Sequence, residues 1–324
     1  MVSFRHKLEQ GLARHGVQVV YKVENLDYDA LLVIGGTRRL GDLRAVRKRG
    51  IPIVQRLDGM NWLHRKRKTG LQHFVRAEAS NLILNTIRSR FADSIIYQSD
   101  FSRAWWERVH GETPVPYSIV FNGVDLNTYA PHEEDTRPDN VFRMLLVEGN
   151  LGGGYETGLE HALELGQMLN ERLSRRLELM VVGRVDPFLR AEVMRSTRFP
   201  IRWVGLVPRD QIPDLDRSAH VFFAADLNPA CPNAVIEAMA CGLPVTAYAT
   251  GALPELVTGD AGRLASFGGD PWQLENPDKN ALADAAEEII IHQNRYRVGA
   301  RHRAEEIFGL DQMIDGYLRA FGWI

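Results

Sequence analysis

The residues best placed to do chemistry lie in the stretch 227–264, where a proline-bearing loop opens a helix. The pattern predicts that this helix begins near Asn233 and ends where Gly242 supplies a left-handed residue. Free backbone N–H groups at a helix N-terminus favour an anion, so the 230–235 loop is a candidate phosphate site. One turn further into the helix, Glu237 would face a polyhydroxylated ligand held by that loop.

This stretch resembles the nucleotide-sugar signature of the retaining GT-B glycosyltransferases of family 4, the glycosyl transferases group 1. The family pattern has an acid eight residues before a glutamate, then Ala-Met-Ala-x-Gly-x-Pro-Val and a Gly-x-x-Pro-Glu turn. Here Glu237 opens the run E-A-M-A-C-G-L-P-V, and the turn runs from Gly251 to Glu255. An ordinary parallel-sheet helix with a glycine stop would not explain Pro232-Asn233 together with both glutamates.

The resemblance implies a retaining hexosyltransferase that moves a sugar from a nucleotide-sugar donor to an acceptor hydroxyl of a glycan or a lipid-linked molecule. It implies a UDP-sugar as donor, with a GDP-sugar as the alternative, and no metal or other cofactor. Glu237 would bind the ribose of the nucleotide. The donor sugar and its diphosphate would be held by the loop residues Cys231, Pro232, Asn233 and Ala234.

The chain departs from the family pattern at three positions that contact the donor. Pro229 stands where the first acid is expected, and Asn150 and Tyr155 stand where the family has an arginine and a lysine. Asp226 could replace the acid only if the loop folds differently. A second hypothesis is therefore a GT-B-like binding or accessory protein with impaired turnover. A GT-B epimerase or phosphorylase shares the fold, but no residue favours it.

Two further loops of the second half are expected to contact the nucleotide. A glycine-rich turn that includes Gly152 and Gly153 follows a strand and could bring backbone amides to a pyrophosphate. The run Gly205, Leu206 and Val207 follows another strand, and the resemblance implies that its backbone receives the base. A plain turn is the alternative for each loop, and for the run from Gly205 it is an equal one. Arg184 and Arg209 are unranked candidates for a cation that meets the phosphate charge.

Asp58 is the candidate catalytic residue of the first half. It follows the strand predicted at 51–55, and a charged side chain at the carboxyl end of a parallel strand is well placed to contact a ligand. The resembled family often has a histidine here that holds the donor sugar. The alternative is a buried structural pair with Arg56.

Strands and helices alternate twice along the chain, which predicts α/β architecture with two doubly wound, Rossmann-like parallel sheets. The first strand of the first sheet is expected at Val17–Val23. Residues 127–140 are predicted to link the sheets. The resemblance implies the GT-B arrangement, in which two domains face each other across a cleft. We expect an N-terminal acceptor domain over 1–130 without the family's usual first strand, and a donor domain over 140–307. A final helix at about 308–324 is expected to pack back on the first domain.

Composition narrows the class of protein further. The chain has 324 residues, 45% hydrophobic and 25% charged, with a net charge of −2, so nothing favours nucleic acid as a partner. The two cysteines form no metal-ligand or disulfide pattern, which indicates a reducing compartment. The sequence contains neither an apolar run long enough to span a membrane nor a signal peptide, so we expect a cytoplasmic location.

One segment departs from the near-neutral charge of the chain. Residues 38–76 hold twelve cationic residues and two acids, which indicates a surface for the acidic groups of an acceptor or for peripheral contact with an anionic membrane at its inner face. The alternative is a solvated basic face.

Overall fold

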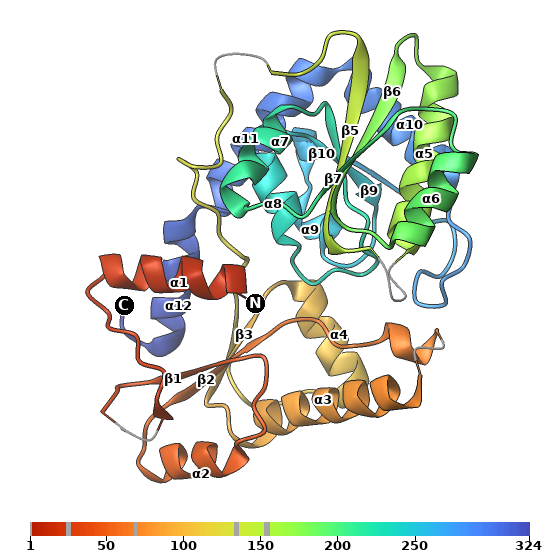
Figure 1. Cartoon of the computed structure of the whole chain (residues 1–324). Helices are drawn as coiled ribbons and strands as arrows, with labels where there is room; N and C mark the ends of the chain where they lie inside the picture. Colours follow the sequence, from red (N-terminus) through yellow and green to blue (C-terminus); the bar gives the residue numbers. More distant parts are fainter. Residues whose placement is uncertain (1, 24–26, 68–69, 133–135, 152–155) are drawn as a thin grey trace. The chain divides into compact units, whose positions relative to one another are not determined.

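The computed structural model describes residues 2–23, 27–67, 70–132, 136–151 and 156–324. The chain divides into two compact units, of which unit 1 comprises residues 1–123 and 308–324 and unit 2 comprises residues 124–307. Each unit contains one parallel sheet with helices on both faces (Figure 1). The predicted α/β class with two parallel sheets is therefore confirmed.

Unit 1 has a four-stranded sheet in the order β1-β2-β3-β4, and every neighbouring pair is parallel. Its strands are β1 (Leu31–Ile34), β2 (Ile53–Leu57), β3 (Ser94–Tyr97) and β4 (Tyr117–Ile119). All five residues of β2 are buried, because helices cover both faces of the sheet. The carboxyl ends of the strands meet at one edge, where parallel sheets commonly bind ligands.

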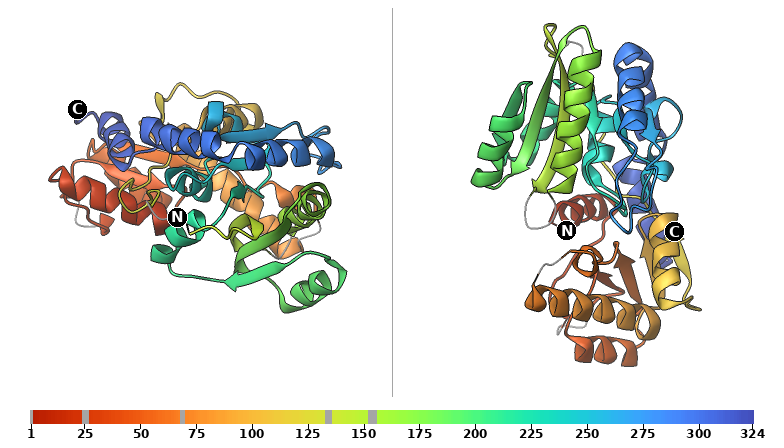
Figure 2. Two further views of the ribbon diagram at one scale, coloured as in Figure 1. Left: turned by 90° about the horizontal axis from the view of Figure 1, so that it is seen from above. Right: turned by 90° about the vertical axis from the view of Figure 1, so that its right-hand side faces the viewer.

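The helices of unit 1 form two layers around this sheet. One layer contains α1 (Val2–Arg14) and α12 (Leu310–Phe321), whose core includes Phe4, Leu8, Ile314 and Tyr317. On the opposite face lie α2 (Leu40–Lys48) and α3 (Leu71–Arg90) (Figures 1 and 2). The short 3-10 helix η2 (Leu63–Arg65) precedes α3, and α4 (Asp100–His110) follows β3.

The strand predicted at Val17–Val23 is wrong. Residues 17–22 have no regular secondary structure, and Val19, Val20 and Tyr21 are exposed. No described strand pairs with this segment. A strand requires a neighbour that satisfies its backbone N–H and C=O groups, and an apolar run alone does not supply one.

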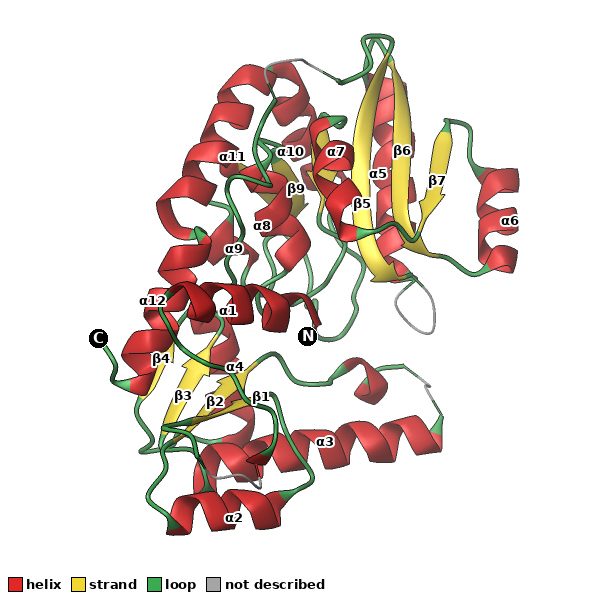
Figure 3. Ribbon diagram, turned by 60° about the vertical axis from the view of Figure 1, so that its left-hand side comes forward, coloured by secondary structure: helices red, strands yellow, loops and turns green. Residues whose placement is uncertain are grey.

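Unit 2 has a six-stranded parallel sheet in the order β10-β9-β8-β5-β6-β7. Its strands β5, β6 and β7 lie side by side in Figure 3. The strands are β5 (Val141–Asn150), β6 (Arg176–Arg184), β7 (Ile201–Gly205), β8 (Val221–Phe223), β9 (Val245–Tyr248) and β10 (Gly262–Ala265). From β5 the chain continues to β6 on one side, whereas from β8 it continues to β9 on the other. The point between β5 and β8 is therefore a topological switch point, which is the usual ligand position in such sheets.

Helices cover both faces of the unit 2 sheet. Helices α5 (Thr157–Arg172) and α10 (Lys279–Ile291) pack against each other and share its largest core, while α7 (Ile212–Arg217) and α8 (Asn233–Ala240) lie on the opposite side (Figure 3). The remaining helices are α6 (Pro187–Ser196), η3 (Arg209–Gln211), α9 (Leu253–Leu256), η4 (Gly259–Ala261) and α11 (Gln293–Ile307). None of the described helices is long and apolar enough to span a bilayer.

Candidate functional site

The candidate site of unit 2 is built around the carboxyl ends of β5 and β8. These strands are paired in parallel through Met144–Val221 and Leu145–Phe222. Gly158, in the first turn of α5, lies so close to the end of β8 that an added Cβ would be 2.7 Å from the Cβ of Ala225. The start of α5 is therefore held against the end of β8 at the switch point.

The loop after β5 begins beside β6. Asn150 is paired with Arg184, and the N–H of Leu151 donates to the carbonyl of Arg184 at 2.8 Å. Arg184 thus lies at the carboxyl edge of the sheet next to this loop, whereas Arg209 belongs to η3. The predicted pyrophosphate contacts Gly152 and Gly153 lie outside the described residues, as does Tyr155.

The loop after β8 is fixed against the turn that precedes α9. Asn228 adopts a left-handed conformation (φ 56°), and the N–H of Ala252 donates to the carbonyl of Pro229 at 2.8 Å. Gly251 (φ 61°) is so close that an added Cβ would lie 2.5 Å from the Pro229 ring. The two loops that resemble the family signature therefore contact each other directly, and the close approach requires glycine at position 251.

Helix α8 begins at Asn233, as predicted, and its N-terminus is uncapped by side chains. Its N-cap is Pro232, with an extended backbone (φ −72°, ψ 117°) and no side-chain cap hydrogen bond. The first turn holds no acidic residue. Cys231 is buried, and Pro232, Asn233 and Ala234 are half-buried. This arrangement leaves the first amides of α8 suited to an anion.

Glu237 lies one turn further along α8 and is half-buried. Burial, followed by the charge of Glu237, raises the pKa of Asp216 on α7 well above its usual range. The same two causes come first in raising the pKa of Tyr129. Glu237 is thus close to both groups. An ionised carboxylate accepts hydrogen bonds only, so the hydroxyl groups of a ribose are complementary to it.

Two arginines fix the segment that carries Tyr129. Arg301 Nη1 donates to the carbonyl of Tyr129 at 2.8 Å and to that of Ala240 at 2.7 Å, and Arg217 Nη1 donates to the carbonyl of Ala130 at 3.1 Å. The wall beside Glu237 is therefore tied to α7, to α11 and to the last residue of α8.

Glu148 is an acid at the switch point that the sequence pattern did not single out. Glu148 is near the end of β5 and Asp226 follows β8, so the parallel pairing of the two strands brings both carboxyls to the same edge. Desolvation, followed by the charge of Asp226, raises the pKa of Glu148. Desolvation also raises the pKa of Asp226, although Asp226 is exposed and Glu148 is half-buried. The only signal in the sequence was an acid at the end of an apolar strand.

The predicted base contacts Gly205, Leu206 and Val207 lie at the carboxyl end of β7, an edge strand two positions from β5. Gly205 has a left-handed backbone (φ 79°), and Leu206 is exposed. These residues share the carboxyl edge with the loops after β5 and β8, but they are not in the group around α8.

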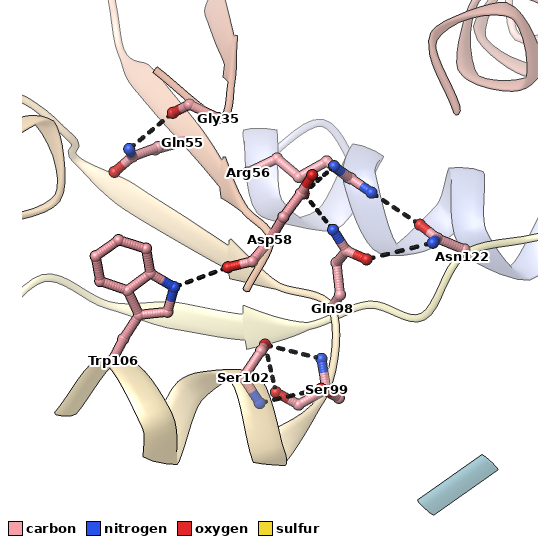
Figure 4. A network of polar contacts seen from close by, with 9 residues as sticks. All are labelled: Gly35, Gln55, Arg56, Asp58, Gln98, Ser99, Ser102, Trp106 and Asn122. Carbon is pink, nitrogen blue, oxygen red and sulfur yellow. Dashed lines mark hydrogen bonds and ion pairs between the residues drawn. The ribbon is translucent and has the colours of Figure 1, made fainter. Parts of the chain in front are cut away.

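Asp58 belongs to unit 1, where it lies in a polar network at the carboxyl edge of the sheet (Figure 4). Arg56 and Gln98 both donate to Asp58 Oδ1, and Arg56 Nη2 also donates to Asn122 Oδ1 at 2.9 Å. Trp106 Nε1 donates to the Asp58 carbonyl at 2.8 Å. The structural pair considered for Asp58 is thus present.

The network nevertheless leaves part of Asp58 accessible. The Arg56 side chain is 3% exposed, whereas that of Asp58 is 42% exposed. Both side-chain contacts of Asp58 fall on Oδ1, so Oδ2 accepts no hydrogen bond from any described residue. The network can hold the carboxylate in one orientation while this oxygen contacts a ligand.

The basic segment 38–76 separates into distinct groups in the structure. Arg44, Arg47 and Lys48 are exposed on α2, whereas Arg65, Lys66 and Arg67 lie in and after η2. Arg76 is exposed on α3. Arg56 is buried in β2, so it does not belong to the basic surface.

Part of the chain matches a known family model. Residues 143–292 match the model described as glycosyl transferases group 1. A GDP-mannose-dependent alpha-(1-6)-phosphatidylinositol dimannoside mannosyltransferase of Mycobacterium tuberculosis is 27% identical over 238 residues, which cover 71% of this chain and 58% of that protein. A D-inositol 3-phosphate glycosyltransferase of Thermobifida fusca is 26% identical over 246 residues, covering 71% and 55%. The chain thus spans less than two thirds of either relative.

Solved structures share the fold over nearly the whole chain. Sucrose-phosphate synthase from Thermosynechococcus elongatus has a TM-score of 0.70 at 18% identity and covers 97% of this chain and 76% of its own. Anabaena HepE in complex with UDP-glucose has a TM-score of 0.69 at 18% identity and covers 93% and 81%. These likenesses, with the two parallel-sheet units, identify the fold as GT-B.

Proposed function

We propose that this GT-B chain is a glycosyltransferase that moves a sugar from a nucleotide-sugar donor to an acceptor hydroxyl with retention of the anomeric configuration. The observation that carries the proposal is the N-terminus of α8, which lies uncapped by side chains in the loop after β8, with Glu237 one turn behind it. The group 1 match over residues 143–292 covers this region and supports the same function.

The proposed chemistry depends on stabilising the diphosphate that leaves the sugar. The negative charge that develops on it would be met by the first backbone amides of α8, at Asn233 and Ala234, and by the dipole of that helix. Glu237 would accept hydrogen bonds from the ribose and so fix the nucleotide. Arg184 is the better-placed cation for the phosphates, because it adjoins the loop after β5. No metal is needed in this scheme.

Asp58 is the proposed catalytic residue of unit 1. Its Oδ2 would contact the donor sugar and stabilise positive charge at the reacting carbon, while Arg56 and Gln98 hold its other oxygen. We propose that unit 1 provides the acceptor side and that the two units face each other across a cleft in the active enzyme.

The donor is proposed to be a UDP-sugar, with a GDP-sugar as the alternative. HepE, which shares the fold, is solved with UDP-glucose, whereas the mycobacterial relative is named as GDP-mannose-dependent. The acceptor is proposed to be a glycan or a lipid-linked molecule, since that relative is named for phosphatidylinositol dimannoside. We propose a cytoplasmic location with peripheral contact at the inner face of the membrane.

The second candidate is a nucleotide-sugar-binding or accessory protein with impaired turnover. The observation that favours it is the packing at Pro229, where the family has an acid. The carbonyl of Pro229 is bonded to Ala252, and its ring is packed against Gly251, so no carboxylate reaches the donor from this position.

One experiment separates the two candidates. Purified protein is incubated with UDP- and GDP-sugars and phosphatidylinositol mannosides, and free nucleotide and product anomers are measured by NMR. If the protein is a glycosyltransferase, we expect release of the nucleotide and a product that keeps the donor's anomeric configuration. Nucleotide binding without release or transfer would favour the accessory protein, and an inverted product would contradict retention.

A further inference from the structure

Unit 2 contains a pocket that is separate from the loops at its switch point. It has a volume of about 540 Å³ and is lined by Pro131 and Arg137, by Arg217 at the end of α7 and by residues of α11 that recur at helical spacing from Asn294 to Glu305. Small-molecule sites commonly have volumes of roughly 300–1,000 Å³, so the pocket is large enough for a ligand of its own.

The pocket lies at the opposite end of α8 from the proposed phosphate contacts. Gly242, which follows the last turn of α8, lines the pocket, and an added Cβ there would lie 3.2 Å from Pro131 Cγ. Arg301, another lining residue, donates to the carbonyl of Ala240, the last residue of α8. A helix of eight residues is about 12 Å long, because each residue adds about 1.5 Å. A ligand in this pocket would therefore bind separately from a nucleotide at the N-terminus of α8.

The charged side chains of the pocket are mainly arginines. Arg137, Arg217, Arg297 and Arg301 line it, and Glu305 is the only acid among the described lining residues. Glu305 Oε1 accepts from Arg301 Nε at 2.6 Å, which balances one of the four positive charges. An excess of positive charge remains, and it favours an anion as the ligand.

Backbone carbonyls hold two of these arginines in fixed positions. Arg301 also donates to the carbonyl of Tyr129, and Arg217 donates to that of Ala130. The Arg217 side chain is 10% exposed and that of its partner Asp214 is 72% exposed, so water weakens this ion pair. Because a carbonyl carries no net charge, the bonds to carbonyls orient the guanidinium groups without neutralising them. An anion would therefore meet positive charge that is already in place.

The other lining residues indicate what kind of anion fits. Val298 and Pro131 add apolar surface, whereas Asn294 and Thr136 carry hydrogen-bonding groups. Guanidinium groups pair well with phosphate oxygens, because their N–H groups match the geometry of the phosphate. The volume leaves room beside a phosphate for a few carbon atoms and hydroxyl groups. These features fit a small phosphate monoester better than a bare inorganic ion.

We propose that the arginine pocket, formed by Arg137, Arg217, Arg297 and Arg301, binds a small phosphate monoester at a site of unit 2 that is separate from the nucleotide. A structural role explains the carbonyl contacts of Arg217 and Arg301, but it does not account for four arginines and one acid gathered around a single pocket. The proposal goes beyond sugar transfer and does not depend on it.

Calorimetric titration of the full chain with glycerol 3-phosphate tests the proposal. The wild type should bind this probe saturably, whereas glycerol should not bind, and inorganic phosphate should compete because the arginines recognise the phosphate group. Saturating UDP should leave the affinity for the probe unchanged, whether or not the chain transfers sugar. The proposal is overturned if the probe does not bind at millimolar concentration, or if UDP displaces it, since the probe would then occupy the donor site.

Variants of Arg137 and Arg297 test the role of charge. Arg137→Gln/Arg297→Gln should bind the probe at least about tenfold more weakly, because each lost bond to a charged group contributes on the order of a tenfold step. Arg137→Lys/Arg297→Lys keeps both charges and should bind more tightly than the glutamine variant. The matched control is Arg190→Gln/Arg195→Gln, which removes two exposed arginines of α6 and should leave the affinity unchanged. Equal losses in the pocket and control variants, or in the lysine and glutamine variants, would contradict the proposal.

An acidic segment of the same chain is the alternative occupant of the pocket. Glu133, Glu134 and Asp135 lie between His132 and Thr136, two residues that line the pocket. The three acids are outside the described residues. Glu133→Gln/Glu134→Gln/Asp135→Asn removes their charge, and the wild type should bind glycerol 3-phosphate without this change. Binding that appears only in the triple variant would assign the pocket to the acidic segment and overturn the proposal.

Discussion

Glu237 is the side chain that most directly connects the structure to nucleotide binding. Glu237→Gln keeps the shape of the side chain and removes its charge, so we expect nucleotide affinity to fall by about 10- to 150-fold, which corresponds to ~1.5–3 kcal/mol for hydrogen bonds to a charged group. Calorimetric titration with UDP and GDP measures this loss. Glu192→Gln on α6, an exposed glutamate of the same unit, is the matched control. Equal affinity in the two variants would remove Glu237 from the site.

A variant of Asp58 tests whether unit 1 contributes a catalytic residue. Asp58→Asn retains a side-chain oxygen near Arg56 but removes the negative charge, so we expect the transfer rate to fall on the order of 100-fold or more while nucleotide affinity stays unchanged. A modest loss of thermal stability should accompany it, because Arg56 is buried and loses its ionic partner. Steady-state kinetics with a titration of the same sample separates the effects. A loss in nucleotide affinity as large as the loss in rate would contradict this role.

Glu148 and Asp226 predict a pH dependence of stability. Both pKa values are raised in the folded protein. The unfolded chain therefore loses these protons at a lower pH than the folded chain does, and stability present in acid is lost as the pH rises through the folded values. Glu148→Gln removes the Glu148 contribution, whose largest cause is desolvation followed by the charge of Asp226. Thermal unfolding should show the variant gaining stability over the wild type at about pH 8 and losing that gain near pH 4. The same gain at both pH values would contradict the raised pKa values.

Many elements were predictable because their signals are local. Helix α8 begins at Asn233 and α11 spans Gln293–Ile307, as expected from helical spacing, proline and glycine. The strand at 17–23 failed because pairing depends on a neighbour that periodicity does not reveal. For the same reason, the meeting of Glu148 and Asp226 could not be predicted: it requires β5 to lie beside β8, although 70 residues separate them in the sequence.

The role of Asp58 shows the same limit within unit 1. The sequence indicated a charged residue at a strand end, and it left a ligand contact and a structural pair with Arg56 as alternatives. The structure brings in Gln98 and Asn122 from the ends of β3 and β4, which are distant in the sequence, and so gives the carboxylate one bound and one open oxygen.

The contact between the loop after β8 and the turn before α9 gives a prediction about elements. Gly251→Ala would place a Cβ 2.5 Å from Pro229 and displace the loop that leads into α8. Gly259→Ala is the matched control, because Gly259 also has a positive φ (56°) but nothing within 4 Å of an added Cβ. Both variants carry a backbone cost of roughly 1–2 kcal/mol. Only Gly251→Ala should also weaken nucleotide binding, by about tenfold or more. Equal affinities in the two variants would separate the loop from the donor site.

The residues with proposed functions are distributed over both units of the chain. Unit 2 holds the amides of α8 and Glu237, and unit 1 holds Asp58. The chain leaves unit 1 after residue 123 and returns at residue 308, where α12 joins the core beside α1. Donor binding should therefore stabilise unit 2 first, because a ligand stabilises the part of the structure that binds it.

Calorimetric titration of the wild-type chain with UDP-sugars and GDP-sugars is the most direct test of the proposed donor site. We expect saturable binding of at least one donor at one site per chain, without added metal, and a weaker complex in the Glu237→Gln variant. Absence of binding by both donors at millimolar concentration, in a sample that is folded by circular dichroism, would contradict a nucleotide-sugar site at the N-terminus of α8.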